Sequence, residues 1–228
     1  MRKKCIVCSN MLNEVHNLEE WFGFVQKLAD GIVIVDSGST DGTIEFAQAQ
    51  PNTVVVVNDT IQKEGYGYAR NELRFLAKKH FQDAHWCVYF DGDERIKKEE
   101  FHTFRFLRDC LVDDFDVIAF PRIDWKPDGT MAKDVVAYPD YQARMTRLSS
   151  PLMYIRKLHE QMKNFKAIYA DIGTPKINHY HRTAGQEVRD KVGKLCAKLH
   201  MEDKVYGNSY PMHHKEEYYR ERYLKEGL

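Results

Sequence analysis

Short apolar segments alternate with segments of helical periodicity over the first part of the chain. Four runs of apolar and β-branched residues predict buried strands: Cys5–Cys8, Gly31–Val35, Thr53–Val57 and Trp86–Phe90. Apolar residues recur at helical spacing from Leu18 to Leu28, and segments from about Thr43 and over Gly65–Lys79 also favour helices. This alternation predicts an α/β fold whose parallel sheet has helices on both faces.

The pattern changes after about residue 121. A Pro-Asp-Gly turn signal at residues 127–129 separates extended segments, and residues 141–148 alternate weakly, which predicts a mixed or antiparallel addition to the sheet. From about residue 183 the sequence is polar and helix-prone. Its narrow apolar stripe consists of Val188, Val192, Leu195 and Leu199. No linker rich in Pro, Gly or Ser divides the chain, so we expect one domain over residues 1–182 and a helical extension, 183–228, packed on it.

The composition is that of a folded globular protein, with 43% apolar and 30% charged residues. The net charge is zero, but residues 1–60 carry −4 and residues 151–228 carry +5 together with six of the ten histidines. The basic end is either a solvated helical surface or a surface for an anionic acceptor or a membrane. The sequence has no Lys/Arg block and no RNA-binding motif, so we expect no nucleic-acid partner.

The cysteines indicate a reducing compartment. Cys5, Cys8 and Cys87 lie in or beside apolar runs, where a thiol behaves as a small buried apolar group. Cys5 and Cys8 form a Cys-x-x-Cys pair, but the absence of a second pair disfavours zinc or dithiol chemistry. The N-terminal sequence lacks the apolar stretch of a signal peptide, and no apolar run is long enough for a membrane span. We therefore expect a cytoplasmic protein, at most peripheral at a membrane.

The first candidate site is Asp36-Ser-Gly-Ser-Thr-Asp-Gly-Thr43, where a strand turns into a helix. Its glycines allow a sharp bend, and small hydroxyls such as Ser39 leave space. Ligands of parallel sheets bind beyond the carboxyl ends of the strands, so Asp36 is placed to accept hydrogen bonds from a base or ribose. An ordinary strand–turn–helix connection is the alternative. The loop has no Walker lysine and no Gly-x-Gly-x-x-Gly, which disfavours an NTPase or a dinucleotide site.

The second candidate is Asp91-Gly-Asp-Glu94, directly after the fourth apolar run. Two carboxylates at a strand end are hard oxygen ligands for Mg²⁺ or Mn²⁺, and such an ion takes further ligands from substrate phosphates. A divalent ion there would offset the charge of a departing nucleoside diphosphate. A polar turn after a strand is the alternative.

These segments and two others form an ordered set of four motifs. In chain order they are Asn13-Glu14, Val35–Thr43, Ala69-Arg-Asn71 and Phe90–Glu94. Their order and spacing resemble those of family-2 glycosyltransferases with the GT-A fold, especially small enzymes that add sugars to lipopolysaccharide cores or similar glycans. The resemblance covers about residues 4–181 and does not extend into residues 182–228.

The resemblance implies a metal-dependent, inverting transfer from a nucleoside diphosphate sugar, with a UDP-sugar expected, to a hydroxyl of a glycan or glycolipid. It implies that Asp36 and the strand end that includes Ser9, Asn10 and Glu14 hold the nucleoside. One departure concerns this strand end. Many relatives carry an aromatic residue or a Pro-x-Tyr pattern before Asn-Glu, where this chain has Ser9-Asn-Met-Leu12. The nucleoside therefore stays open.

The remaining donor-binding residues also follow from the resemblance. Arg70 is implied to approach the base or the diphosphate, while Ser39 and Gly92 belong to the motifs that surround the donor. Asp93 is implied to bind the metal. Asp91 is implied to contact the ribose, a metal-bound water or the metal itself.

The pair His159-Glu160 supplies the candidate catalytic base. In the subgroup that the chain resembles, such a pair follows a strand at this distance beyond the acidic motif, which implies that Glu160 deprotonates the acceptor hydroxyl. A carboxylate in a partly dry cleft can have the raised pKa that suits this task. A surface His-Glu pair after a strand is the alternative, and Asp140 is the reserve candidate for the base.

Asn178-His-Tyr-His181 supplies the candidate third metal ligand. The resemblance points to a late histidine, either His179 or His181, and we favour His179. Imidazole suits Mn²⁺ better than Mg²⁺. Packing or surface exposure is the alternative for either histidine.

Two other functional classes fit less well. A sugar nucleotidyltransferase would need a glycine-rich, Arg-bearing loop after the first strand, and residues 8–13 contain no glycine. A phosphatase with an aspartyl nucleophile usually carries its Asp-x-Asp element on the first strand. A nucleotide-sugar-binding domain without activity is the non-enzymatic alternative, but the acidic pair, Arg70 and Glu160 are all present.

Overall fold

The centre of the sheet consists of the four apolar runs found in the sequence. The computed structural model describes residues 2–111, 113–132, 138–180 and 186–206. The central strands are β1 (Cys5–Met11), β2 (Gly31–Asp36), β3 (Thr53–Val57) and β4 (Trp86–Tyr89). They lie side by side in the order β3-β2-β1-β4, and every neighbouring pair is parallel. The predicted α/β fold with a parallel core is confirmed, although β1 continues three residues beyond the predicted strand.

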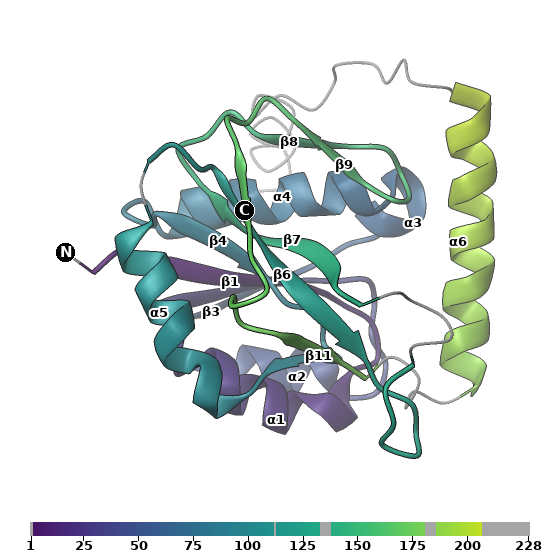
Figure 1. Ribbon diagram of the computed structural model, residues 1–228. Helices are drawn as coiled ribbons and strands as arrows, with labels where there is room; N and C mark the ends of the chain where they lie inside the picture. The colour runs from purple at the N-terminus through teal and green to yellow at the C-terminus, as the bar shows by residue number, and fades with distance from the viewer. Residues whose placement is uncertain (1, 112, 133–137, 181–185, 207–228) are drawn as a thin grey trace.

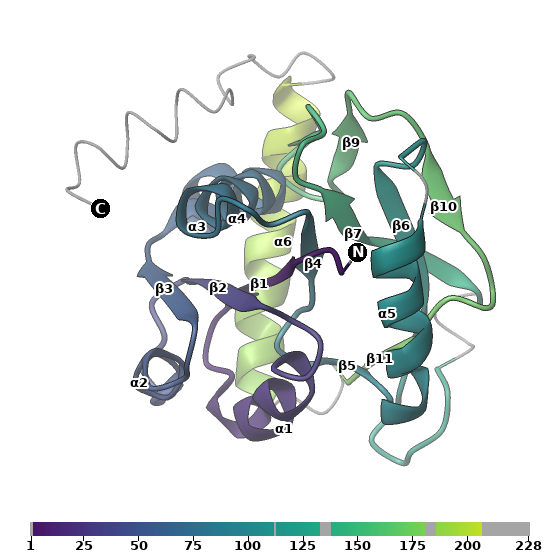
Figure 2. The same cartoon turned by 90° about the vertical axis from the view of Figure 1, so that its left-hand side faces the viewer.

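The helices connect these strands and cover the sheet (Figure 1). They are α1 (Val15–Val25), α2 (Thr43–Gln48), α3 (Thr60–Glu64), α4 (Tyr66–His80), the 3₁₀ turn η1 (Lys98–Glu100), α5 (Phe101–Cys110) and α6 (Gln186–Tyr206). Helices α1, α2 and α5 contribute buried side chains to one face of the sheet, and α4 does so to the other. Figure 2 shows this separation of the helices, as the pattern of the sequence predicts.

The second half of the chain extends the sheet with mixed strands. They are β5 (Glu94–Ile96), β6 (Val117–Asp124), β7 (Asp140–Arg147), β10 (Ile168–Ala170) and β11 (Ile177–His179). Strand β7 lies antiparallel between β4 and β6, and the order continues through β11 to β5. A separate hairpin pairs β8 (Met153–Ile155) with β9 (Gln161–Lys163). The predicted mixed or antiparallel addition to the sheet is therefore confirmed, in its mixed form.

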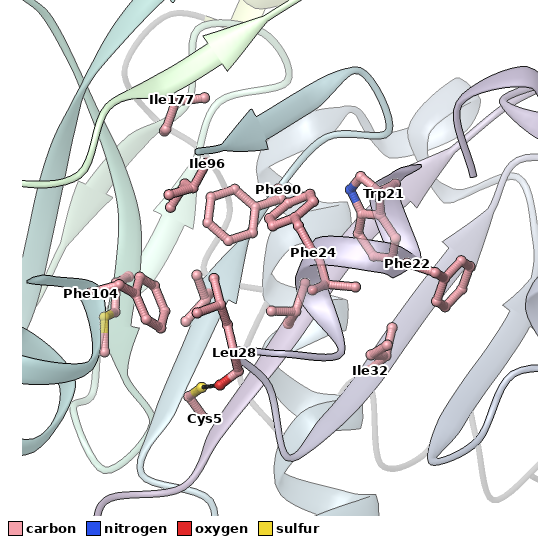
Figure 3. Close-up of a cluster of buried hydrophobic side chains, with 14 of the residues drawn as sticks. Cys5, Trp21, Phe22, Phe24, Leu28, Ile32, Phe90, Ile96, Phe104 and Ile177 are labelled. Atoms are coloured by element: carbon pink, nitrogen blue, oxygen red, sulfur yellow. Dashed lines mark hydrogen bonds between the residues drawn. The ribbon is translucent and has the colours of Figure 1, made fainter. Parts of the chain in front are cut away.

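Two apolar layers hold the sheet between the helices. In α1, side chains at helical spacing such as Trp21 and Phe24 face the sheet, where Phe24 meets the ring of Phe90 edge-on at 5.3 Å between centroids (Figure 3). Cys5 belongs to this layer and Cys8 to the opposite one, because successive side chains of a strand alternate between faces. This alternation separates the two thiols of the Cys-x-x-Cys pair.

Helix α6 lies within the predicted helical extension, 183–228, of which residues 207–228 lie outside the described residues. Of its predicted apolar stripe, Leu199 is fully buried, while Val192 and Leu195 are partly buried. The side chain of Val188 lies outside the described residues. Within the described part of the chain, the helices fall short of the length and apolar character that a membrane crossing needs.

Candidate active site

A cavity of about 630 Å³ opens at the carboxyl ends of β1 and β4. Its walls come from the end of β1, the turn after β4, the start of α4, the segment after β8, the end of β11 and one face of α6. This is the edge of a parallel sheet where ligands are expected to bind.

The acidic turn after β4 is fixed through its backbone. The indole of Trp21 donates to the carbonyl oxygen of Asp91 at 3.1 Å, and the Tyr180 amide donates to that of Asp93 at 2.9 Å. A Cβ atom at Gly92 would lie 2.8 Å from Cγ of Glu14, so only glycine lets the Glu14 side chain lie against this turn. These contacts hold the backbone from which the carboxylates of the turn project.

The register of β11 places His179 beside Asp93. His179 pairs with Glu94 of β5 on one side and with Asp124 of β6 on the other. Its Nε2 atom lies 3.5 Å from Oδ2 of Asp93, and its Nδ1 atom lies 2.5 Å from Oδ1 of Asp124. Burial alone would lower the pKa of His179, but the hydrogen bonds with these two carboxylates raise it to about 10.

This donor set suits a divalent metal ion, which would replace the proton that the two carboxylates stabilise on the ring. The Asp93 carboxylate and the His179 ring face each other, and Asp124 binds the other ring nitrogen, as carboxylates often do behind a metal-binding histidine. Among the described residues no three His, Cys, Asp or Glu side chains converge as a complete metal site. The remaining ligands would come from water and substrate phosphates, as is common for Mg²⁺ and Mn²⁺. The alternative ligand His181 lies outside the described residues.

Asp91 is partly neutralised by a buried arginine that the sequence analysis missed. Nη2 of Arg144 lies 3.0 Å from Oδ2 of Asp91 and also pairs with the fully buried Glu94. Burial raises the pKa of Glu94, although the charge of Arg144 opposes this. The only sequence signal for this role was that Arg144 stands between two apolar residues in a segment where polar and apolar positions alternate. The pairing points Asp91 toward Arg144 and leaves Asp93 facing His179.

Glu14 joins the two aspartates in an acidic cluster. Burial raises its pKa to about 7, the carboxylates of Asp93 and Asp91 add to this rise, and the hydrogen bond from Asn17 opposes it. The resemblance implied a nucleoside contact for Glu14. The structure places its side chain beside the acidic turn and among the cavity-lining residues.

Asp36 organises a turn and does not line the cavity. It is fully buried, and its Oδ1 atom accepts hydrogen bonds from the amides of Gly38 and Ser39 at 2.8 and 2.7 Å. Its Oδ2 atom accepts one from the Ser39 hydroxyl at 2.6 Å. Ser39 and the buried Ser9 are likewise not among the lining residues. In this arrangement Asp36, Ser39 and Ser9 therefore do not line the cavity, and their roles in donor binding stay predictions.

Three other polar residues near the Asp36 turn do line the cavity and offer polar atoms to a ligand. Asn10, Ser37 and Gln62 line the cavity. The Asn10 Oδ1, Ser37 Oγ and Gln62 Oε1 atoms are buried and make no hydrogen bond to the described residues. Asn10 was a predicted donor-binding residue, whereas Ser37 and Gln62 were not singled out. Buried polar atoms normally have partners, so these three mark a place where a polar ligand is expected.

Arg70 and Glu160 meet in the cavity as an ion pair. Nε of Arg70 lies 2.6 Å from Oε1 of Glu160, and the guanidinium lies over the rings of Tyr89 and Tyr154. Burial raises the pKa of Glu160, but the charge of Arg70 and its hydrogen bond outweigh burial, and the pKa is lowered overall. The expectation of a raised pKa was therefore wrong, because the sequence did not show this pairing.

The reserve base occupies a different position. Asp140 forms an ion pair with Arg122 at 2.9 Å and is not among the residues that line the cavity.

Helix α6 supplies part of the cavity wall through Lys191, Val192, Leu195 and Cys196. The sequence left the role of this segment open, because a polar helix with a narrow apolar stripe carries no chemical motif.

Comparisons with known proteins concern the fold. A crystal structure of a mycobacterial protein matches with a TM-score of 0.53 and 15% identity, over 86% of this chain and 72% of that one. Glucosyl-3-phosphoglycerate synthase from Mycobacterium tuberculosis, in complex with Mn²⁺, UDP-glucose and phosphoglyceric acid, gives a TM-score of 0.42 and 21% identity, over 60% of this chain and 49% of that one. 4-Diphosphocytidyl-2C-methyl-D-erythritol synthase gives a TM-score of 0.42 and 14% identity, over 64% of this chain and 75% of that one.

The chain spans less than half the length of the glucosyl-3-phosphoglycerate synthase chains that it matches. No protein-family model matches the chain, and no curated protein matches it in sequence. At these identities the likenesses describe architecture. The protein has a mixed α/β fold with a central, mostly parallel sheet, and this agrees with the predicted GT-A fold class.

Proposed function

We propose that the protein is an inverting glycosyltransferase that moves a sugar from a nucleoside diphosphate sugar to a hydroxyl of a glycan or glycolipid. We expect a UDP-sugar as donor and Mn²⁺ or Mg²⁺ as cofactor. One observation carries the proposal: the pair formed by Asp93 and His179 lines the same cavity as the carboxylate of Glu160. Metal-binding groups and a base that share one cavity meet the needs of such a transfer.

The donor would bind along the ends of β1 and β4. Asp93 and His179 would hold the divalent ion, which supplies positive charge against the leaving diphosphate. Arg144 fixes the direction of Asp91, and the buried polar atoms of Asn10 and Ser37 offer hydrogen bonds to a base or ribose. The residues of this wall therefore bind and orient the donor.

Glu160 would act on the acceptor. Because Arg70 keeps its pKa low, the Glu160 carboxylate is ionised at neutral pH and can take the proton of the attacking hydroxyl. The hydroxyl oxygen attacks the anomeric carbon as the bond to the diphosphate breaks. No covalent enzyme intermediate is needed, and an α-linked donor gives a β-linked product.

The test is a panel of UDP-, GDP- and dTDP-sugars with Mn²⁺, with and without glycan acceptors, and with EDTA as the control. We expect EDTA-sensitive release of nucleoside diphosphate from one donor class, slow with water and faster with an acceptor. Formation of pyrophosphate from a nucleoside triphosphate would instead identify a nucleotidyltransferase. Metal-dependent binding without turnover of any donor would identify a binding domain.

A further inference from the structure

The segment that leads to Glu160 has a backbone that needs support. Arg156 and His159 have φ angles of 74° and 52°, in the left-handed region that side-chain-bearing residues rarely adopt. Such conformations persist where the surroundings hold them in place. Since His159 directly precedes Glu160, whatever holds this segment also sets the position of the carboxylate.

Helix α4 supports the segment from one side. The Tyr66 amide donates to the carbonyl oxygen of Lys157 at 2.8 Å. A Cβ atom at Gly65 would lie 2.5 Å from Cα of Lys157, and one at Gly67 would meet the carbonyl oxygen of Arg156. The two backbones therefore touch directly, and the same helix carries Arg70, the ion-pair partner of Glu160.

Helix α6 supports the segment from the other side through Asp203. This carboxylate is only 6% exposed. Its Oδ1 atom accepts a hydrogen bond from the Lys157 amide at 2.9 Å, and its Oδ2 atom accepts one from the Leu158 amide at 3.1 Å. Hydrogen bonds from backbone amides to an ionised carboxylate are stronger than those between neutral groups. Asp203 thus binds the backbone two and three residues before Glu160.

Other contacts keep α6 in this place. Nζ of Lys198 donates to the carbonyl oxygen of Gln62 in α3 at 3.2 Å, and the Glu202 carboxylate pairs with Nζ of Lys157. The rings of His159 and His200 meet edge-on, with 6.5 Å between their centroids. Figure 1 shows α6 running past α3. Glu202 contacts Lys157 through the side chain alone, which makes Glu202 the matched control for Asp203.

We propose that Asp203 is a positioning residue for Glu160, and that α6 is thereby an integral part of the transferase site. The inference rests on the proposed function, because it concerns the base of that reaction. Asp203 is not among the described residues that line the cavity. It acts through the backbone of residues 157 and 158, which together with α4 fixes the direction from which Glu160 enters the cavity.

The test compares Asp203→Ala and Asp203→Asn with Glu202→Gln. Because a misplacement of about 1 Å can cost about 100-fold in rate, we expect Asp203→Ala to lower kcat for transfer about 10- to 100-fold and to leave the donor KM within about twofold. Asn keeps one acceptor oxygen, so Asp203→Asn should recover part of the loss. Glu202→Gln keeps an acceptor oxygen for Nζ of Lys157 and leaves the two backbone hydrogen bonds of Asp203 in place, so it should transfer at the parental rate. Amide hydrogen exchange at residues 157 and 158 should be faster in Asp203→Ala and unchanged in Glu202→Gln.

Several results would overturn the proposal. One is a folded Asp203→Ala protein with parental kcat, and another is a loss of donor affinity equal to the loss of kcat. If Asp203→Ala does not fold, Asp203→Asn decides in the same way. If the parental protein turns over no donor, the proposed function fails, while unchanged exchange at residues 157 and 158 would independently refute the role of Asp203.

Discussion

The two walls of the cavity are built from different kinds of structure. On the side where we propose that the donor binds (the donor wall), the register of β5 and β11 brings Asp93 and His179 together. On the side where we propose that the acceptor binds (the acceptor wall), Glu160 lies on an irregular segment held between the start of α4 and the end of α6. Hydrogen-bonded strands fix relative positions through regular geometry, whereas the acceptor side depends on individual contacts. Loss of a single contact should therefore have different effects on the geometry of the two walls.

The largest effect is expected from Asp93→Ala on the donor wall. Even the loss of a residue that only hydrogen-bonds to a metal ligand lowers metal affinity about 10- to 100-fold, so loss of a direct ligand should weaken Mn²⁺-dependent UDP binding at least about 100-fold. Isothermal titration with and without Mn²⁺ measures this. Asp128→Ala, in the exposed turn of residues 127–129, is the control. Unchanged Mn²⁺-dependent affinity in Asp93→Ala would count against the ligand role.

Glu160→Gln tests the acceptor wall. A positioned base contributes about 10²- to 10⁴-fold, so transfer should fall by about 10²-fold or more while donor binding persists. The measurement pairs transfer kinetics with UDP titration. Transfer at the parental rate would place the base elsewhere.

Arg144→Met tests whether the donor wall also contributes to stability. The change leaves Glu94 buried without its cation, and breaking a buried ion pair in this way typically costs about 3–5 kcal/mol. Urea unfolding measures the free energy of unfolding. The control is Arg2→Ala, whose ion pair with Asp30 is more exposed and should contribute less than about 1 kcal/mol. Similar losses of unfolding free energy in Arg144→Met and Arg2→Ala would show that the buried pair contributes no more to stability than the exposed one.

The smallest effect is a shift in the pH profile of Arg70→Met. In the parental protein the pKa of Glu160 is lowered, so transfer should fall only as the pH drops through that low pKa. Without Arg70, burial raises the pKa with less opposition, and the acidic limb of kcat should move to higher pH. Arg105→Met, which removes an exposed arginine, should leave the limb in place. An unmoved limb in Arg70→Met would mean that this pair does not set the ionisation of the base.

Much of the donor wall could be predicted because its determinants are local. The continuous apolar run Trp86–Phe90 predicts a buried strand, and the acidic residues after it must then lie at the ligand-binding edge of a parallel sheet. The approach of His179 to Asp93 depends instead on which strands pair far along the chain. The resemblance implied this approach, and the register of β11 shows it directly.

Other site features required the three-dimensional arrangement. Asp36 ends β2 as predicted, but its carboxylate is turned into the bend by hydrogen bonds to Gly38 and Ser39. The lowered pKa of Glu160 comes from Arg70, ninety residues away in the chain. Neither outcome can be read from residue type, because side-chain direction and charge pairing follow from packing.

Hydrophobic periodicity alone predicted, in chain order, the four central strands and helices α1, α2 and α4 between them, because it is a local property; α3, β5 and α5 were not predicted. The sequence by itself also determined which strand ends carry carboxylates. The arrangement in space was needed to show that Arg144 pairs with Asp91 and that Asp203 binds the segment before Glu160. These contacts join residues about 45 to 53 positions apart, and burial and electrostatic energies depend on distance in space rather than on separation along the chain.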